Sequence, residues 1–128
     1  MKPTPFQSPR LPRPKAPYSQ AVRAGDFLFI SGQVGVHPTT NEMVLDSFEA
    51  QVEQTLENLK TIVEDAGRTL ADVVKTSVFL ADIEQFAAFN GVYKRYFGDA
   101  PPARSAFQAS RLPFGALVEI EAIVWMGK

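Results

Sequence analysis

The chain has 128 residues, a formal net charge of −1 and a hydrophobic fraction of 45%, which suits one globular domain. With no cysteine and a single histidine, His37, which we interpret as a surface loop residue, it cannot form disulfides, a thiolate nucleophile or a His/Cys metal site. No global basic charge attracts nucleic acid or an anionic membrane, and no apolar run is long enough to span a bilayer.

The first residues are rich in proline and basic. The first 17 hold six of the ten prolines, and the first 20 hold four basic residues and no acidic one. Proline at this density prevents a helix and favours an extended chain. We therefore expect a proline-rich basic N-terminal arm over residues 1–15, outside the core and lying across a neighbouring surface, and one domain over residues 16–128. Neither a secretory signal nor a transit helix is recognisable, so we expect a cytoplasmic protein.

Residues 21–31 are predicted to form a β-hairpin. Its turn is Ala24-Gly25-Asp26, and the apolar run over residues 27–30 is its second strand. Gly32 follows this strand. A glycine at such a place marks either a bulge with close backbone approach or an ordinary strand end.

Apolar residues at helical spacing predict a first helix over residues 47–66. Asp46 or Ser47 can cap its N-terminus, and Gly67 ends it. A strand is predicted next, over residues 73–80. The side chains on one of its faces are Val74, Thr76, Val78 and Leu80.

A second helix is predicted over residues 83–97, between the cap Asp82 and Gly98. Its apolar stripe is Ile83, Phe86, Tyr93 and Phe97. Asn90 lies on the same stripe, where its amide needs a partner. A structural hydrogen bond is the interpretation that the sequence favours, and a place beside a site is the alternative.

Arg104 begins a strand that carries Phe107 on the opposite face. If the aromatic ring marks the packed face, Arg104 points away from that core. A guanidinium there can bind a carboxylate through two parallel hydrogen bonds. A solvated or salt-bridged surface arginine is the alternative.

The last strand, over residues 117–125, has two different faces. One is uniformly apolar, whereas the other mixes Glu119 and Glu121 with Trp125 and other apolar residues. Two helices cover only one face of a sheet, so we expect an α+β fold with a single mixed sheet whose second face packs on another subunit. Glu119 and Glu121 would then be partly desolvated and suited to acid–base chemistry, or would form interfacial salt bridges.

Several separated motifs, in order from residue 16 to the C-terminus, resemble the RidA/YjgF family of enamine/imine deaminases. They are Ala16-Pro17-Tyr18-Ser19-Gln20-Ala21, Ile30-Ser31-Gly32-Gln33, Asn58-Leu59-Lys60, residues 74–80, Phe89-Asn90, Pro102-Ala103-Arg104-Ser105 and Glu119-Ile120-Glu121-Ala122. The resemblance implies a chorismate-mutase-like fold and a homotrimer, with sheets packed around the threefold axis and the site in the cleft between subunits.

The resemblance also assigns roles. Arg104 would bind the substrate carboxylate, Glu119 would hold the attacking water, and Tyr18 would close the pocket. Asn90 would border it, and the backbone of Ser31, Gly32 and Ala106 would frame the ligand. We expect Arg104 and Glu119 to come from one chain, with Tyr18 or Asn90 from its neighbour.

The implied activity is hydrolysis of 2-imino acids and enamines, such as 2-aminoacrylate, 2-iminobutanoate and 2-iminopropanoate, to 2-keto acids and ammonia, with no metal or organic cofactor. Alternatives are a non-catalytic protein that binds small carboxylates such as 2-keto acids, a deaminase for an aminomuconate-like acid, and an endoribonuclease or translation inhibitor, which the acidic core disfavours. The chain departs from many members at Ala106, where they carry cysteine, at Ala16, and in its proline-rich start, where they form a short strand.

Overall fold

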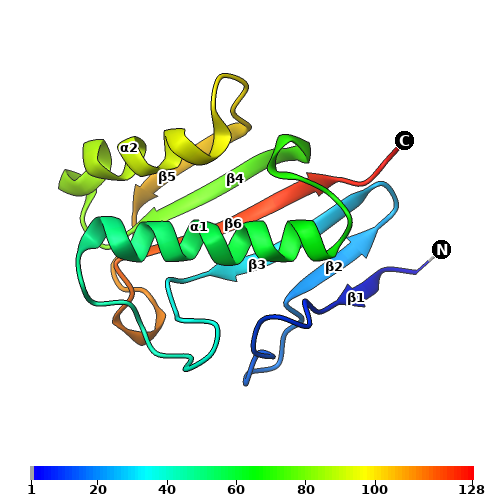
Figure 1. Ribbon diagram of the computed structural model, residues 1–128, viewed down its shortest axis with the longest axis horizontal. Helices are drawn as coiled ribbons and strands as arrows, with labels where there is room; N and C mark the ends of the chain where they lie inside the picture. The colour runs from blue at the N-terminus through cyan, green and yellow to red at the C-terminus, as the bar shows by residue number, and fades with distance from the viewer. Residues whose placement is uncertain (1) are drawn as a thin grey trace.

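One mixed β-sheet organises the chain. The computed structural model describes residues 2–128, which form six strands in the spatial order β1-β2-β3-β6-β4-β5 and two α-helices (Figure 1). The strands are β1 (Thr4–Phe6), β2 (Ala21–Ala24), β3 (Phe27–Gln33), β4 (Val73–Leu80), β5 (Ala103–Gln108) and β6 (Val118–Trp125). The helices are α1 (Phe48–Asp65) and α2 (Phe86–Phe97), with 3₁₀ turns η1 (Leu70–Asp72), η2 (Ile83–Gln85) and η3 (Pro113–Gly115). The predicted α+β fold is confirmed.

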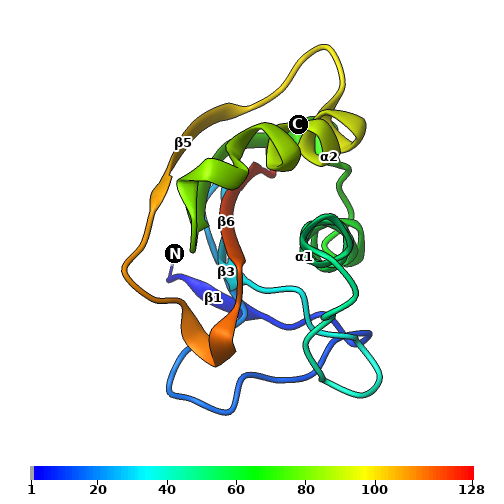
Figure 2. The ribbon, with the colours of Figure 1, turned by 90° about the vertical axis from the view of Figure 1, so that its left-hand side faces the viewer.

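Both helices lie on the same face of the curved sheet, as Figure 2 shows. All neighbouring strands are antiparallel except β4 and β5, which are parallel because α2 carries the chain back between them. Within residues 2–128, neither helix has the length and apolar character that crossing a bilayer requires.

The core lies between α1, α2 and the sheet, and central strand β6 supplies the middle of it. The buried side chains of β6 are Val118, Ile120, Ala122 and Val124. Those of α1 include Val52, Leu56, Leu59 and Val63, at the predicted helical spacing. Ser47 caps α1 by accepting a hydrogen bond from the backbone N–H of Ala50, and Gly67 follows with φ of +86°, a left-handed conformation that glycine adopts without strain.

The other sheet face carries no helix, and we call it the open face. Its exposed large apolar side chains are Phe27, Phe29, Phe107, Leu117 and Trp125. Phe107 packs edge-on against Phe79, with ring centroids 5.1 Å apart. The two-faced character predicted for the last strand is therefore present, because Glu119 and Glu121 alternate with the buried residues of β6.

Two predictions about which face a residue occupies were wrong. Phe107 is 51% exposed and lies on the open face, whereas Arg104 points to the helix side, above α2. The aromatic ring marked a face that no element of the same chain covers. Val74 is exposed because the pairing of β4 with β6 shifts register between Val73 and Lys75, which places Val73 in the core instead.

The start of the second helix also differs from the prediction. Residues 83–85 form the 3₁₀ turn η2, and Asp82 accepts a hydrogen bond from the N–H of Glu84 as expected of a cap. Ile83 and Phe86 are 40% and 36% exposed, whereas Phe89, outside the predicted stripe, is fully buried. The helix therefore packs around Phe89 and not around its first turn.

The N-terminal segment is extended and is attached to β2 and α1 of the same chain. Residues 4–6 pair with β2 as an edge strand, which tolerates proline on its unpaired side. Ser8 is fully buried: its N–H donates to Gln20 at 2.7 Å and its hydroxyl to Asp65 at 2.5 Å. Arg10 completes the attachment with a 2.7 Å ion pair to Asp65 at the end of α1. The chain therefore has the short strand that its prolines argued against.

Replacing Asp65 with asparagine should lower the melting temperature at neutral pH. Hydrogen bonds from Arg10 and Ser8 hold the pKa of Asp65 below its ordinary value. The carboxylate therefore stabilises the fold above the unfolded-state pKa near ~4, and this contribution is lost as pH falls through the lower folded-state pKa. Thermal melts from pH 7 to 2.5 should show the difference between wild type and Asp65→Asn shrinking with acid.

Glu64→Gln is the matched control, because Glu64 lies 3.8 Å from the same arginine but is far more exposed. It should change the melting temperature little. A constant difference between wild type and Asp65→Asn across the whole pH range would contradict the assignment of this stability to the Asp65 carboxylate.

Candidate functional site

Arg104 lies on edge strand β5 with its guanidinium over the aromatic face of α2. Its Nη1 donates a hydrogen bond to Oδ1 of Asn90 at 2.9 Å. Its guanidinium carbon lies 4.9 Å from the ring centre of Tyr93 and 5.3 Å from that of Phe86, within the range of cation–π attraction. The hydrogen bond that the sequence predicted for Asn90 is therefore made, and its partner is the candidate arginine.

Arg104 makes no salt bridge with any carboxylate of residues 2–128. A guanidinium has five N–H donors, so the bond to Asn90 leaves a planar pair free for a ligand. Arg104, Asn90, Tyr93 and Pro102 line a hollow of about 380 Å³. We call Arg104, Asn90 and Ala106, which follows Arg104 on the same face of β5, the arginine cluster. It can hold a small carboxylate on a partly apolar surface.

Glu119 lies on β6 and faces the open side of the sheet. The pairing of β3 with β6 shifts register between Ile30 and Gln33, so a bulge forms around Ser31 and Gly32. This bulge brings the Gly32 backbone against the glutamate: a Cβ at Gly32 would lie only 2.4 Å from Oε2 of Glu119. Of the two sequence interpretations of Gly32, the bulge with close approach is the correct one.

Ser31 and Tyr18 lie beside this bulge. The Ser31 hydroxyl donates to the carbonyl of Ser19 at 2.7 Å, and its N–H donates to the carbonyl of Gln20 at 2.9 Å. These bonds fix the segment that carries Tyr18, whose side chain is 55% exposed. Tyr18 and Gly32 line a hollow of about 300 Å³. We call Tyr18, Ser31, Gly32 and Glu119 the glutamate cluster.

One chain does not bring the two clusters together. Arg104 is on the helix side of the sheet and Glu119 is on the open face, so the sheet itself separates them. This differs from the expectation that one chain supplies both residues to a cleft. Asn90 also differs, because it contacts Arg104 of its own chain and was expected to come from a neighbour.

Burial raises the pKa of Glu119, and the nearby Glu121 raises it further. The two residues are two apart on one strand face, roughly 6–7 Å along it, and a like charge at that distance disfavours ionisation. Glu119 therefore keeps its proton to a higher pH than an ordinary glutamate. A carboxyl group with a raised pKa is a stronger base once ionised than an ordinary glutamate, which suits it to accept and return protons.

Sequence reasoning placed Phe86 and Tyr93 on the apolar stripe of the second helix, but it did not relate them to Arg104 and it left out Phe89. Phe86, Phe89 and Tyr93 follow one another at helical spacing, and that spacing was the available signal. The position of His37 was predicted correctly, since it is exposed in a loop, where its Nδ1 accepts a hydrogen bond from the N–H of Thr39. Residues 2–128 contain no group of three or more His, Cys, Asp or Glu side chains placed to hold a metal ion.

Known proteins resemble the chain over nearly its whole length. A family model described as endoribonuclease L-PSP matches residues 9–126. A RutC family protein of Pyrococcus horikoshii is 51% identical over 114 residues, which cover 89% of this chain and 90% of that protein. A protein of Dermatophagoides farinae named 2-iminobutanoate/2-iminopropanoate deaminase is 42% identical, and the match covers 93% of each.

The fold matches solved structures equally well. The crystal structure of E. coli TdcF with bound serine superposes with a TM-score of 0.90 at 38% identity, covering 97% of this chain and 99% of that one. The similarity therefore extends over nearly the whole chain.

Replacing Glu121 with glutamine should lower the pKa of Glu119, because a neighbouring negative charge is removed while burial is unchanged. The Glu119 pKa should stay above its ordinary value, since burial is the larger cause. A carboxyl-carbon NMR titration measures this directly. Glu42→Gln, in an exposed loop, is the control and should leave the Glu119 pKa where it is. An unchanged pKa in Glu121→Gln would show that the two carboxylates do not interact.

Proposed function

The chain belongs to the endoribonuclease L-PSP family, which is the YjgF/RidA family, and we propose that it hydrolyses 2-imino acids and their enamine forms to 2-keto acids and ammonia in the cytoplasm. The observation that carries this proposal is the Arg104 guanidinium, held by Asn90 and aromatic rings but without a carboxylate partner among residues 2–128. The name of the Dermatophagoides relative points to the same reaction.

Arg104 would hold the substrate carboxylate through two parallel hydrogen bonds. Asn90 uses one donor of the guanidinium and fixes its plane, so less side-chain freedom is lost when the ligand binds. The substrate's reacting carbon is then at a fixed distance from the arginine, which is the main contribution that positioning can make to the rate. Arg104 stays protonated and takes no part in proton transfer.

We propose that each site forms between two subunits of a homotrimer. The open face leaves five large apolar side chains uncovered, more than a monomer normally exposes to water on one face. Packing these faces together around a threefold axis would set the arginine cluster of one chain beside the glutamate cluster of the next. Tyr18, Ser31, Gly32 and Glu119 would then come from one chain, and Arg104, Asn90 and Ala106 from its neighbour.

The reaction needs few protein groups. Water adds to the imine carbon and forms a tetrahedral carbinolamine, while the Glu119 carboxylate accepts a water proton and passes it to the nitrogen. Glu119 next takes the hydroxyl proton of the carbinolamine and delivers it to the amine nitrogen, so that the C–N bond breaks as the C=O bond forms, and ammonia and the 2-keto acid leave. A backbone carbonyl at the Ser31-Gly32 bulge accepts a hydrogen bond from the substrate nitrogen, and Tyr18 closes the pocket.

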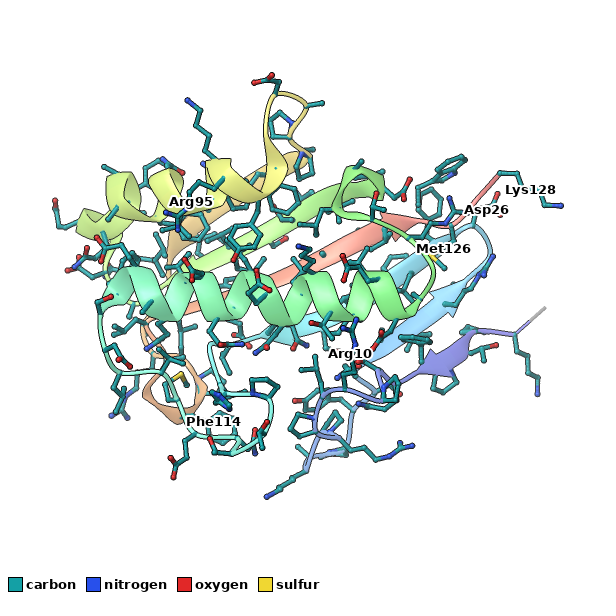
Figure 3. The ribbon with its side chains drawn as sticks, in the orientation of Figure 1. Arg10, Asp26, Arg95, Phe114, Met126 and Lys128 are labelled. Carbon is teal, nitrogen blue, oxygen red and sulfur yellow. The ribbon has the colours of Figure 1, made fainter. Side chains whose placement is uncertain are left out.

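Arg104→Ala should lower kcat/KM for 2-iminopropanoate by about thirtyfold to a thousandfold, corresponding to about 2–4 kcal/mol of transition-state binding. Arg104→Lys should also fail, because a point charge does not replace a planar pair of donors. The assay follows disappearance of freshly generated imine. The control is Arg95→Ala, which removes the same charge from α2 (Figure 3). Arg95 pairs with Glu53 at 3.0 Å.

Wild-type turnover in Arg104→Ala would exclude Arg104 as the carboxylate ligand. Binding of pyruvate by wild type without imine turnover would favour the non-catalytic alternative. Cleavage of RNA by metal-free protein, lost in Arg104→Ala, would favour the endoribonuclease alternative.

Mixing two inactive variants tests the shared site. Arg104→Ala and Glu119→Gln, refolded together, should regain activity, because about one quarter of the clefts in random trimers join an intact Arg104 to an intact Glu119. Glu119→Gln mixed with Tyr18→Ala is the control and should stay inactive, since both residues belong to the same cluster. Mixed trimers of the first pair that remain inactive would show that the clusters do not face each other across a subunit boundary.

A further inference from the structure

Phe114 combines exposure with an unfavourable backbone conformation. It lies at the tip of the loop between β5 and β6 (Figure 3), and its side chain is 84% exposed. Its φ and ψ are 61° and 23°, and Gly115 follows with φ of +67°. The N–H of Ala116 donates to the carbonyl of Pro113 at 3.1 Å and closes the turn. Two successive left-handed residues form a turn that asparagine-glycine or aspartate-glycine serves best.

A phenylalanine at this position is not explained by the folding of one chain. An L-residue with a large side chain is strained at positive φ, and an exposed ring gains no burial to offset that strain. Such strain persists only where the surrounding structure imposes it, and it concentrates at binding sites. We therefore expect the ring to make a contact that the isolated chain does not provide.

The loop is fixed in place, so the ring has a defined position. The N–H of Leu117 donates to Oε1 of Gln51 at 2.6 Å. Gln51 is fully buried in α1, and its Nε2 donates to the carbonyl of Val44 at 3.0 Å. Ala116 is buried as well. The tip is thus held from below by the helix, immediately before the strand that carries Glu119.

Phe114 borders the hollow that two members of the glutamate cluster, Tyr18 and Gly32, also line. The rest of this space of about 300 Å³ is lined by basic and polar side chains, which include Arg13 and Lys15, and by apolar side chains of the N-terminal segment and of the chain after β3. These apolar side chains are Leu11, Pro12, Pro14, Val34 and Val36.

We propose that Phe114 is a specificity-determining residue that contacts the side chain of the substrate and favours 2-imino acids with a branched apolar side chain over the smallest ones. This rests on the proposed function. Arg104 accounts for the substrate carboxylate and Glu119 for the reacting carbon, so the side chain is the part of the substrate that remains. The hollow between Tyr18 and Phe114 offers it an apolar wall, and contact with the substrate removes the exposed ring from water.

The test measures kcat/KM for two imines, generated in the assay from L-leucine and from L-alanine. Wild type, Phe114→Asn and Leu45→Ala are compared. Asparagine keeps the left-handed turn and removes the ring. Leu45 is 78% exposed and does not line the hollow, so it is the matched control for loss of an exposed apolar side chain. The ratio of kcat/KM for the leucine-derived over the alanine-derived imine should fall about five- to tenfold in Phe114→Asn and stay constant in Leu45→Ala.

A second readout does not depend on turnover. Calorimetric binding of 4-methyl-2-oxopentanoate and pyruvate, the corresponding keto acids, should show the same preference in wild type and its loss in Phe114→Asn. If wild type prefers 4-methyl-2-oxopentanoate in binding but turns over no imine, the role of Phe114 is supported and the proposed deaminase function is contradicted. Wild type that binds neither keto acid, or a variant that weakens both equally, would overturn the proposal.

One other explanation remains, which is that Phe114 contacts another subunit. The melting temperature and the assembly state distinguish it from the proposal. Phe114→Asn should melt at a higher temperature than wild type, because asparagine adopts positive φ with less strain. Its mass by light scattering should equal that of wild type. A lower melting temperature, or dissociation of the assembly, would show that the ring packs against another chain and would overturn the proposal.

Discussion

The period of two along β6 is the constraint on which the rest of the structure depends. Ile120 must lie beneath the helices for the core to close, and Glu119 and Glu121 must therefore face the other way. The helix-side position of Arg104 follows from the same alternation on β5. A single chain therefore presents its carboxylate-binding group on the helix side of the sheet and its carboxyl base on the open face. Because the two groups lie on opposite faces of the sheet, the proposed assembly would have to bring a different face from each of two subunits to one site.

Long, regular patterns in the sequence predicted most of the fold. The bounds of β4, the cap Ser47, the stop at Gly67 and the two faces of β6 all agree with the structure. These features are set by neighbours in the chain, through helical or strand periodicity and through local capping. The family resemblance supplied the fold and directed attention to Arg104 and Glu119, although neither spacing nor composition related them to each other.

The wrong predictions have physical causes that cannot be read from a single sequence. Phe107 was assigned to the core because aromatic rings are usually buried, but both faces of this sheet carry large apolar residues. Val74 was misplaced because a bulge in β4 changes the alternation. The strand at residues 4–6 was overlooked because the proline-rich start was taken for an extended arm outside the core, whereas an edge strand needs only alternate donors and so tolerates proline. The separation of Arg104 from Glu119 depends on which face each strand turns toward the helices.

The loops and the strands of this protein are under different structural constraints. A substitution at Glu119 or Phe107 alters the open face, so in the proposed assembly it would affect subunit packing and any chemistry there at once. Phe114 and the segment before Tyr18 border the same hollow from the periphery, and Gln51 and Asp65 anchor them from within α1. Sequence drift can therefore remodel the rim of this hollow without disturbing the sheet. We therefore expect sequence differences between relatives to accumulate in these two segments before they appear in the sheet.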